Sequence, residues 1–404
     1  MIKLKARCWM SCVLALLSAS LIDAQGTSPT PAADAVIHFD GVLRASSING
    51  VEEAYLERVF RSSHAANLVK LQNSDLLCFW FSGTREGDSN VAIVTSRLAK
   101  GSQQWSKAIE IDHQEGRSFQ NPIAFQLPDG RLWLLHTSQA AGEGQTNAEV
   151  LYLTSDDAGQ TWTTPQPLFT QPGSFVRQPP VLLGQKDWLL PMYYTPSRNI
   201  TDGAESHYSA IKLTNDGGKH WKECKVPQSN GLVQPSVVRL ANGHFLSFFR
   251  SRYADFIYQS TSENGCEWTV PTPTRLPNNN SSIQAVMLQD GSLAITFNNN
   301  SSGLTRDKTG VSPRKPLSIA LSTDGGKSWP WVRDIDTGSS PGEQKKFQDW
   351  THEEYSYPSL LQDANGQINV GYTYNREAIK VVRFDEEWIK AGHSEGKFKG
   401  DSPK

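Results

Sequence analysis

The 404-residue chain has no excess of basic charge, because 39 Lys and Arg residues stand against 41 Asp and Glu residues, a formal net charge of −2 at pH 7. It therefore lacks the positive field with which proteins bind nucleic acid. Cysteine is scarce, with five in total, and no pair has the spacing of a zinc site. Beyond residue 24 no stretch is apolar enough to span a membrane. We therefore predict that the mature protein binds no nucleic acid, membrane, metal or cofactor.

The N-terminus has the pattern of a secretory signal peptide. Three basic residues precede an apolar run over residues 8–22, and Ala24 offers a small residue for cleavage. The run is short for a membrane span, so we predict a signal peptide over residues 1–24 and a linker over 25–34, with a membrane anchor as the alternative. The signal peptide predicts a secreted or periplasmic protein.

Three cysteines remain after the predicted cleavage. Cys78 lies in the apolar segment LLCFWF and is expected to be buried. Cys224 and Cys266 are candidates for a disulfide in an oxidising compartment.

A short motif, Ser/Thr-x-Asp-x-Gly-x-x-Trp, recurs along the chain. It begins at Ser155, Thr214 and Ser322, and a looser copy with Glu263 in place of Asp begins at Thr261. In each copy we expect the Asp to cap backbone N–H groups, the Gly to adopt a positive φ, and the Trp to close the turn against a sheet. Such recurrence indicates an array of one supersecondary unit.

The segments between these turns share one order: strand, tight turn, strand, loop, strand, turn and a short fourth strand. Tryptophans that mark successive units are separated by 47 to 61 residues and lie at positions 105, 162, 221, 268, 329 and 388. We predict an all-β fold, a six-bladed β-propeller with four-stranded blades over residues 35–389, closed by an N-terminal strand over 35–43. A polar tail over 390–404 follows; an open stack of β-units is the alternative.

Strand direction sorts the loops onto two faces. Because successive antiparallel strands reverse, the starts of the first strands and the second-to-third loops share one face, opposite the Asp-bearing turns. Arginine and tyrosine side chains that converge on one face suit an anionic, hydroxyl-rich ligand, although surface loops are polar in any case. Candidate ligand-binding residues on this face include Arg85, Asn121, His136, Arg177, Gln178, Arg250, Arg314 and Tyr374.

These turns, on a six-unit array, resemble those of the sialidase superfamily, and the resemblance covers nearly the whole mature chain. Sialidases hold the carboxylate of their sugar with three arginines. The resemblance implies Arg250, at the end of SFFR, as the second and Arg314, in SPRKPLSIALS, as the third. It also implies Tyr357, at the start of YPSLL, as the nucleophile.

Two positions depart from the family pattern. His64 stands where the first arginine is expected, and Gln234 stands where a glutamate should activate the tyrosine. A tyrosine with a pKa near 10 needs help to act as a nucleophile near neutrality, and glutamine cannot accept its proton. Another group must therefore deprotonate Tyr357, or Tyr357 has another role. Arg177, at the equivalent strand start of the third unit, is a candidate to replace the lost arginine.

The first unit also resembles a branch of sialidase-like secreted proteins with a histidine at this position and a GTREG loop, here residues 83–87. This resemblance implies a carbohydrate-active propeller, and it raises a second possibility, a polysaccharide lyase with His64 as the base that removes a proton next to a uronic carboxylate. Sialidases take their acid from the same loop, where Asp88 and Glu86 are both candidates; Arg85 is either a ligand contact or their salt-bridge partner.

We therefore expect a monomeric, carbohydrate-active enzyme that releases a terminal acidic sugar such as sialic acid from a glycan. The reaction expected is exo-glycosidase hydrolysis, with the uronate lyase as the alternative enzyme. A glycan-binding propeller without catalysis, suggested by Gln234, is the third possibility. The sequence leaves the sugar and its linkage open.

Overall fold

The computed structural model describes residues 37–196, 204–301, 313–338, 353–392 and 394–395. The predicted signal peptide and linker lie outside these residues. The chain divides into two compact units, residues 1–37 and 38–404, and the fold described below is that of the second unit alone. Of its described helices, none combines the length and the apolar character that a membrane crossing requires.

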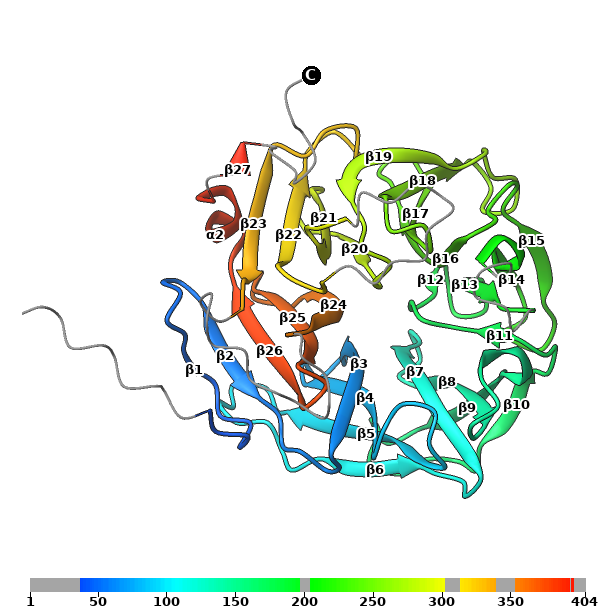
Figure 1. Cartoon of the computed structure of the whole chain (residues 1–404), viewed down its shortest axis with the longest axis horizontal. Helices are drawn as coiled ribbons and strands as arrows, with labels where there is room; N and C mark the ends of the chain where they lie inside the picture. Colours follow the sequence, from blue (N-terminus) through cyan, green and yellow to red (C-terminus); the bar gives the residue numbers. More distant parts are fainter. Residues whose placement is uncertain (1–36, 197–203, 302–312, 339–352, 393, 396–404) are drawn as a thin grey trace, which may run out of the picture. The chain divides into compact units, whose positions relative to one another are not determined.

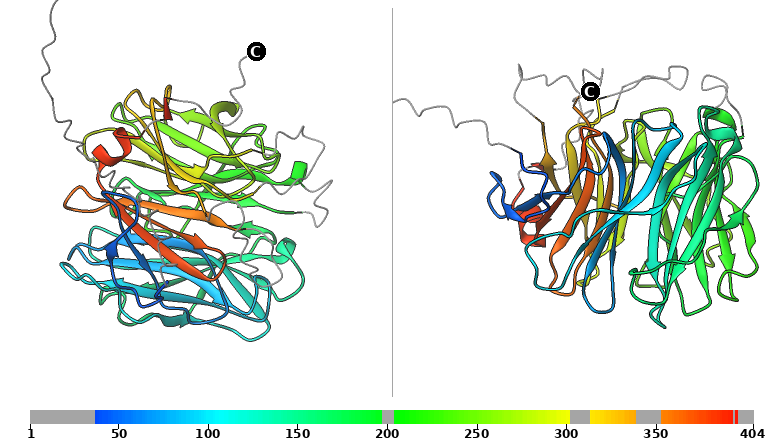
Figure 2. Two further views of the ribbon diagram at one scale, coloured as in Figure 1. Left: turned by 60° about the vertical axis from the view of Figure 1, so that its left-hand side comes forward. Right: turned by 90° about the horizontal axis from the view of Figure 1, so that it is seen from below.

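Antiparallel strands arranged around a central axis make this unit an all-β propeller (Figure 1). The strands run between two opposite faces of the ring (Figure 2). The innermost strand of each sheet lies near the axis. From it the chain moves outward through successive hairpins.

The first sheet contains two antiparallel groups that are joined by a short parallel contact between β5 and β7. The first group is β3 (Ser62–Lys70), β4 (Leu76–Gly83), β5 (Asn90–Leu98) and β6 (Ile109–Asp112). The second is β7 (Arg117–Gln126), β8 (Leu132–Ala140), β9 (Glu149–Ser155) and β10 (Gln166–Phe169), with the short helix η1 (Gln145–Asn147) between β8 and β9.

The next two sheets follow the same outward order. One is built from β11 (Ser174–Phe175) and β12 (Val181–Leu182), both paired with β13 (Trp188–Tyr194), then β14 (Tyr208–Thr214) and β15 (Lys222–Lys225). The short helix η2 (Ala204–Ser206) precedes β14. The other is β16 (Leu232–Arg239), β17 (Phe245–Ser251), β18 (Phe256–Ser262) and β19 (Thr272–Pro277).

Two further sheets bring the ends of the unit together. One is β20 (Gln284–Met287), β21 (Leu293–Asn298), β22 (Leu317–Ser322), β23 (Trp331–Asp336) and β27 (Ser394–Glu395). The other is β24 (Tyr355–Gln362), β25 (Ile368–Tyr374), β26 (Ala378–Phe384), β2 (Glu52–Tyr55) and β1 (Arg44–Ala45). Helix α2 (Glu386–Lys390) precedes β27, so part of the predicted polar tail is a sheet strand.

The N-terminal strand that pairs with the last sheet is not the one predicted. Within residues 37–43 no residue belongs to a strand, and Val42 makes only an isolated bridge to Gln104. Gly41, at φ 71°, turns the chain here, which interrupts the predicted strand. Instead β2 pairs antiparallel with β26, from Glu52 opposite Arg383 to Tyr55 opposite Lys380.

The repeated turns have the predicted hydrogen bonds. Oδ1 of Asp157 accepts from the backbone N–H groups of Gln160 and Thr161, both at 2.9 Å, and Gly159 has a φ of 83°. The turns at Asp216 and Asp324 have the same capping contact from the residue four positions on. In the looser copy the cap is not Glu263. Asn264 accepts the N–H groups instead, because this turn is one residue shorter.

Four innermost strands contain a bulge at equivalent places. The pairing of β3, β7, β16 and β24 with their neighbours shifts register near the strand start. At each bulge one residue other than glycine has a positive φ: Ala65 (62°), Asn121 (50°), Gln234 (52°) and Tyr357 (53°). A bulge turns a side chain away from the direction that strand alternation dictates, and here it does so near the axis.

Side chains of β3, β16, β20 and β24 contact the backbone of a neighbouring innermost strand. Asn67 accepts from the N–H of Ala124 at 2.8 Å, and Ser236 accepts from the N–H of Ala285 at 2.9 Å. Gln284 accepts from Leu360, and Ser359 accepts from Leu68, both at 2.8 Å. These four contacts join innermost strands that hydrogen-bond to each other nowhere else in the sheet ladders.

The cysteines are arranged as expected. Cys224 of β15 and Cys266, in the turn after β18, form a disulfide that ties two sheets together. Cys78 is a buried free thiol in β4, where burial raises its pKa.

Candidate functional site

The centre of the candidate site is the phenol of Tyr357. Its position at the bulge of β24, with a φ of 53°, places the ring among charged side chains from other sheets. The guanidinium carbons of Arg177, Arg250 and Arg314 lie 5.3, 5.5 and 5.4 Å from its ring centroid. Residues hundreds of positions apart in the sequence are thus gathered around one ring.

Arg250, at the end of β17, makes the closest contact with the Tyr357 hydroxyl. Its Nη1 donates to the hydroxyl at 2.5 Å and to Oε1 of Gln234 at 3.1 Å, and its Nε donates to Asn280 at 2.9 Å. The guanidinium is buried, at 4 % exposure. Gln234 therefore contacts the arginine and orients it, while its amide nitrogen approaches the hydroxyl of Tyr193.

The charges around Tyr357 change its acidity. Burial raises the pKa of the phenol, but the guanidinium groups of Arg250 and Arg314 outweigh it, and the pKa falls to about 8. A positive charge near a phenol favours the phenolate. The arginines thus supply part of the activation that a glutamate at position 234 would have supplied.

His64, in β3, packs against Tyr357 with ring centroids 4.1 Å apart. Nδ1 of His64 lies 2.8 Å from the hydroxyl of Thr373 and 3.9 Å from Oε1 of Glu354. Nε2 is buried and has no hydrogen-bond partner among the described residues. Burial, assisted by the charge of Arg376, lowers the pKa of the imidazole well below its usual value, so His64 is neutral near pH 7.

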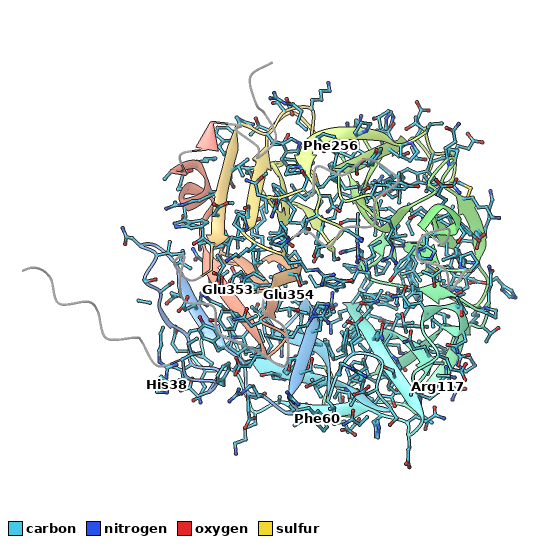
Figure 3. All side chains as sticks on the ribbon, in the orientation of Figure 1. His38, Phe60, Arg117, Phe256, Glu353 and Glu354 are labelled. Carbon is cyan, nitrogen blue, oxygen red and sulfur yellow. A yellow bond between two sulfur atoms is a disulfide. The ribbon has the colours of Figure 1, made fainter. Side chains whose placement is uncertain are left out.

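Glu354 organises the remaining arginines. Its Oε1 accepts from Nη1 of Arg314 at 2.7 Å, from Nε of Arg376 at 3.0 Å and from the hydroxyl of Ser356 at 2.5 Å. Figure 3 shows Glu354 near the axis of the ring, whereas Arg117 lies toward the rim. Burial raises the pKa of this carboxyl, but the two arginines outweigh it and hold the pKa well below the usual range.

Arg376 lies beside the position of the lost arginine. Its carbonyl accepts from the backbone N–H of Ser63, next to His64, and its guanidinium bridges Glu354 and Glu86, with Nη1 2.6 Å from Oε2 of Glu86. A guanidinium from the turn after β25 is thus adjacent to the strand on which the resemblance predicted one. Sequence alignment of the first strand cannot find it, because it comes from another strand.

The two candidate acids occupy different environments. Glu86 reaches Arg376, and its charge also acts on Tyr357, where it raises the pKa of the phenol. Asp88 forms an exposed pair with Arg85 at 3.4 Å. The structure therefore brings Glu86 to the Tyr357 site and leaves Asp88 and Arg85 in the loop beside it.

Arg177 is part of the packed interior. It is 2 % exposed, and its guanidinium donates to Ser282 and to the carbonyls of Ala66, Tyr357 and Pro358. These contacts use all three nitrogens, so the structure shows Arg177 in a structural role, and its predicted role as a ligand contact stays a prediction. Its role is to hold the backbone of the β24 bulge.

Other predicted ligand residues also have internal partners. Nε2 of His136 lies 2.8 Å from Asp112, and Gln178 donates to the carbonyl of Ile283. Tyr374 packs against Tyr55 and Tyr355. Asn121 lies closer to the site, since its amide and that of Gln234 both approach the hydroxyl of Tyr193, at 3.5 and 3.4 Å.

The sequence interpretation missed Glu354 as a site residue, and it gave Arg376 no role beyond a place on the ligand face. Glu354 immediately precedes the predicted tyrosine strand, and Arg376 follows the next strand, on the face predicted to bind ligand. The direction of these strands places both residues on that face, and it is the sequence signal that could have identified them. Among the described residues, no group of three or more His, Cys, Asp or Glu side chains is placed to hold a metal ion.

Comparisons with known proteins agree with this architecture. Residues 74–370 match the BNR repeat-like domain family. No curated protein matches the sequence. The fold is similar to the Hadza microbial sialidase Hz136, with a TM-score of 0.64 at 15 % identity over 82 % of this chain and 67 % of that one.

Two further solved structures are similar over almost their whole length. The intramolecular trans-sialidase from Ruminococcus gnavus, in complex with oseltamivir carboxylate, has a TM-score of 0.64 at 13 % identity over 83 % of this chain and 97 % of its own. A protein of unknown function from Dyadobacter fermentans has a TM-score of 0.66 at 15 % identity over 84 % of this chain and 100 % of its own. The fold is sialidase-like.

Proposed function

Because the chain belongs to the BNR repeat-like domain family, within the sialidase-like superfamily, we propose that it is a glycoside hydrolase that releases a terminal acidic sugar from a glycan. The observation that carries the proposal is the phenol of Tyr357 with three guanidinium carbons within 5.5 Å of its ring and Arg250 on its hydroxyl. Positive charge that is fixed before the substrate arrives stabilises an anionic guest and an ionised nucleophile.

In the proposed reaction, Arg250, Arg314 and Arg376 bind the carboxylate of the sugar. The phenolate oxygen of Tyr357 forms a bond to the anomeric carbon as the bond to the leaving oxygen breaks, and water later releases the sugar from the tyrosine. The pKa of about 8 makes the phenolate accessible without a glutamate at position 234.

Glu86 is the proposed proton donor to the leaving oxygen. It forms an ion pair with Arg376 in the structure. In our proposal the carboxylate of the substrate takes the place of Glu86 on Arg376, which frees Glu86 to hold a proton. Asp88 is the alternative donor, from the same loop.

We further propose six four-stranded blades closed by β2, and export of the protein after removal of a signal peptide over residues 1–24. The pairing of β2 with β26 supports the closure. The disulfide between Cys224 and Cys266 supports an oxidising compartment.

The test is an assay of purified protein against sialosides, Kdo-containing glycans and rhamnosyl-glucuronates. We expect sugar release from one class and a loss of at least about 1,000-fold in Tyr357→Phe, because a nucleophile is removed. Tyr152→Phe is the matched control, since the Tyr152 ring stacks on Trp133 far from these arginines in the sheet order. No release from any class would end the proposal, and binding without release would favour a glycan-binding protein.

A uronate lyase is the second candidate function. It is favoured by one observation: His64 is neutral at pH 7, and its Nε2 has no hydrogen-bond partner among the described residues, so it can accept a proton. A lyase leaves a conjugated double bond in the product, which absorbs ultraviolet light. Turnover of a rhamnosyl-glucuronate without new absorbance would exclude this reaction.

A further inference from the structure

A polar hollow lies beside the Tyr357 site, between the β4–β5 loop and the β8–β9 loop. Its volume is about 340 Å³, within the range of about 300–1,000 Å³ typical of ligand sites. The two loops are joined directly, because the N–H of Gly142 donates to the carbonyl of Gly87 at 3.0 Å. The hollow is therefore a feature of two adjoining sheets and not of a single loop.

Two residues that line the hollow also contact arginines near Tyr357. Glu86, which lines it, accepts from Arg376 at 2.6 Å. Gln145, which also lines it, accepts from Nη2 of Arg252 at 3.5 Å, and the charge of Arg252 helps to lower the pKa of Tyr357. A ligand bound to the arginines can thus extend into the hollow past Glu86.

The lining is chemically specific. It contains the amides of Gln120, Gln139 and Gln145 and no aromatic or aliphatic side chain. Gln120 and Gln139 are both 3 % exposed, and Oε1 of Gln139 is buried without a partner among the described residues. A buried amide oxygen without a hydrogen bond is costly, and a ligand hydroxyl relieves that cost.

The charge of the lining disfavours a second acidic group. Glu86 and Asp88 contribute two carboxylates, and Arg85, the one cation among the lining residues, is paired with Asp88. An anionic sugar is repelled here, whereas hydroxyl groups can donate to the carboxylates and to the amide oxygens. The hollow differs in this respect from the arginines beside it.

We propose that this hollow binds the neutral, hydroxyl-rich sugar to which the terminal acidic sugar is linked. The inference rests on the proposed function and adds the chemistry of the leaving group. Gln139 and Gln145 bind its hydroxyls, and Glu86 lies between the two sugars, where a proton donor to the linking oxygen belongs. The substrate is then at least an acidic–neutral disaccharide, recognised by amides without aromatic stacking.

The experiment measures binding by calorimetry in the Tyr357→Phe background, so that no turnover occurs. The probes are sialyllactose and a disaccharide of terminal Kdo on a neutral sugar, each beside its free acidic monosaccharide. For the class that binds, we expect the glycoside to bind at least tenfold more tightly than the free acidic sugar. Gln139→Leu, of nearly equal volume, and Gln145→Ala should each remove most of that difference and leave the Kd of the monosaccharide unchanged.

Gln160→Leu is the matched control, because Gln160 lies in the turn after β9, on the opposite face, and should leave both constants unchanged. Thermal unfolding verifies that each variant is folded; if Gln139→Leu is not, Gln145→Ala alone decides. If a monosaccharide binds and its glycoside is no tighter, or if neither glutamine variant alters the ratio, the hollow is not this subsite although the acidic-sugar site stands. If no monosaccharide and no glycoside binds, the proposed function fails and this inference with it.

Discussion

The acidity of Tyr357 gives the sharpest prediction, because it can be measured before any substrate is known. Nη1 of Arg250 lies 2.5 Å from the hydroxyl, and its charge is the largest of those that lower the pKa of the phenol to about 8. An ordinary tyrosine has a pKa of about 10, so the surroundings favour the phenolate by about 2.7 kcal/mol despite the burial of the ring.

Arg250→Gln removes the closest of these charges and leaves Arg314. Burial of the ring, which raises the pKa of the phenol, is then opposed by less positive charge. We expect the pKa to rise by at least about one unit, or about 1.4 kcal/mol, so that the phenolate fraction at pH 8 falls from about one-half to about one-tenth or less. If the phenolate is the nucleophile, the rise of kcat with pH moves upward by the same amount.

The assay is a spectrophotometric pH titration of tyrosinate, taken as the difference between each protein and its Tyr357→Phe counterpart. Arg250→Lys, which keeps a positive charge, should retain most of the shift. Arg131→Gln, which removes an exposed charge paired with Asp156, is the control and should leave the titration unchanged. A midpoint near 8 that persists in Arg250→Gln would refute the electrostatic account of the tyrosine.

Three further predictions concern stability. Arg177→Met should lower the free energy of unfolding by at least about 3 kcal/mol in chemical denaturation. The reason is that the buried carbonyls of Ala66, Tyr357 and Pro358 lose their hydrogen-bond donor. A smaller loss than in an exposed Arg→Met variant would contradict a structural role for Arg177. Cys224→Ser with Cys266→Ser removes a cross-link over a sequence separation of 42, for which we expect a loss of about 4 kcal/mol that a reducing agent reproduces in the wild type. The folded-state pKa of His64 is lowered, so its neutral form contributes stability that is complete above the unfolded value of about 6.5 and is lost as pH falls below it. The decline of the thermal midpoint between pH 7 and 5 should therefore be shallower in His64→Gln, and an equal decline in both proteins would show that His64 does not titrate on unfolding.

The sequence predicted the gathering of the central residues because strand direction alone decides it. His64, Arg250 and Tyr357 lie near strand ends on one face, Arg314 lies in the segment that leads into β22, and antiparallel order brings these positions together. The repeated turns followed from local chemistry, in which one Asp, one Gly and one Trp specify the bend. Both kinds of inference need only the backbone.

The features that the sequence did not predict depend on how deeply a side chain is buried and on which groups it contacts. Arg177 occupies the expected strand start, yet its guanidinium points to carbonyls, which no spacing reveals. Glu354 and Arg376 complete the arginine contacts from segments outside the aligned strands. The closing strand was misplaced because the apolar residues within 35–43 suggest a strand, whereas the positive φ of Gly41 turns the chain there.

The contacts between innermost strands affect how the propeller unfolds. They are made by the side chains of Asn67, Ser236, Gln284 and Ser359. Each of these side chains accepts a hydrogen bond from a backbone N–H of a neighbouring innermost strand. In an open solenoid, a terminal repeat can fray while the others persist. The four contacts couple β16, β20, β24, β3 and β7 in one series, so the loss of one of these strands removes contacts from its neighbours, and we expect the five strands to unfold cooperatively.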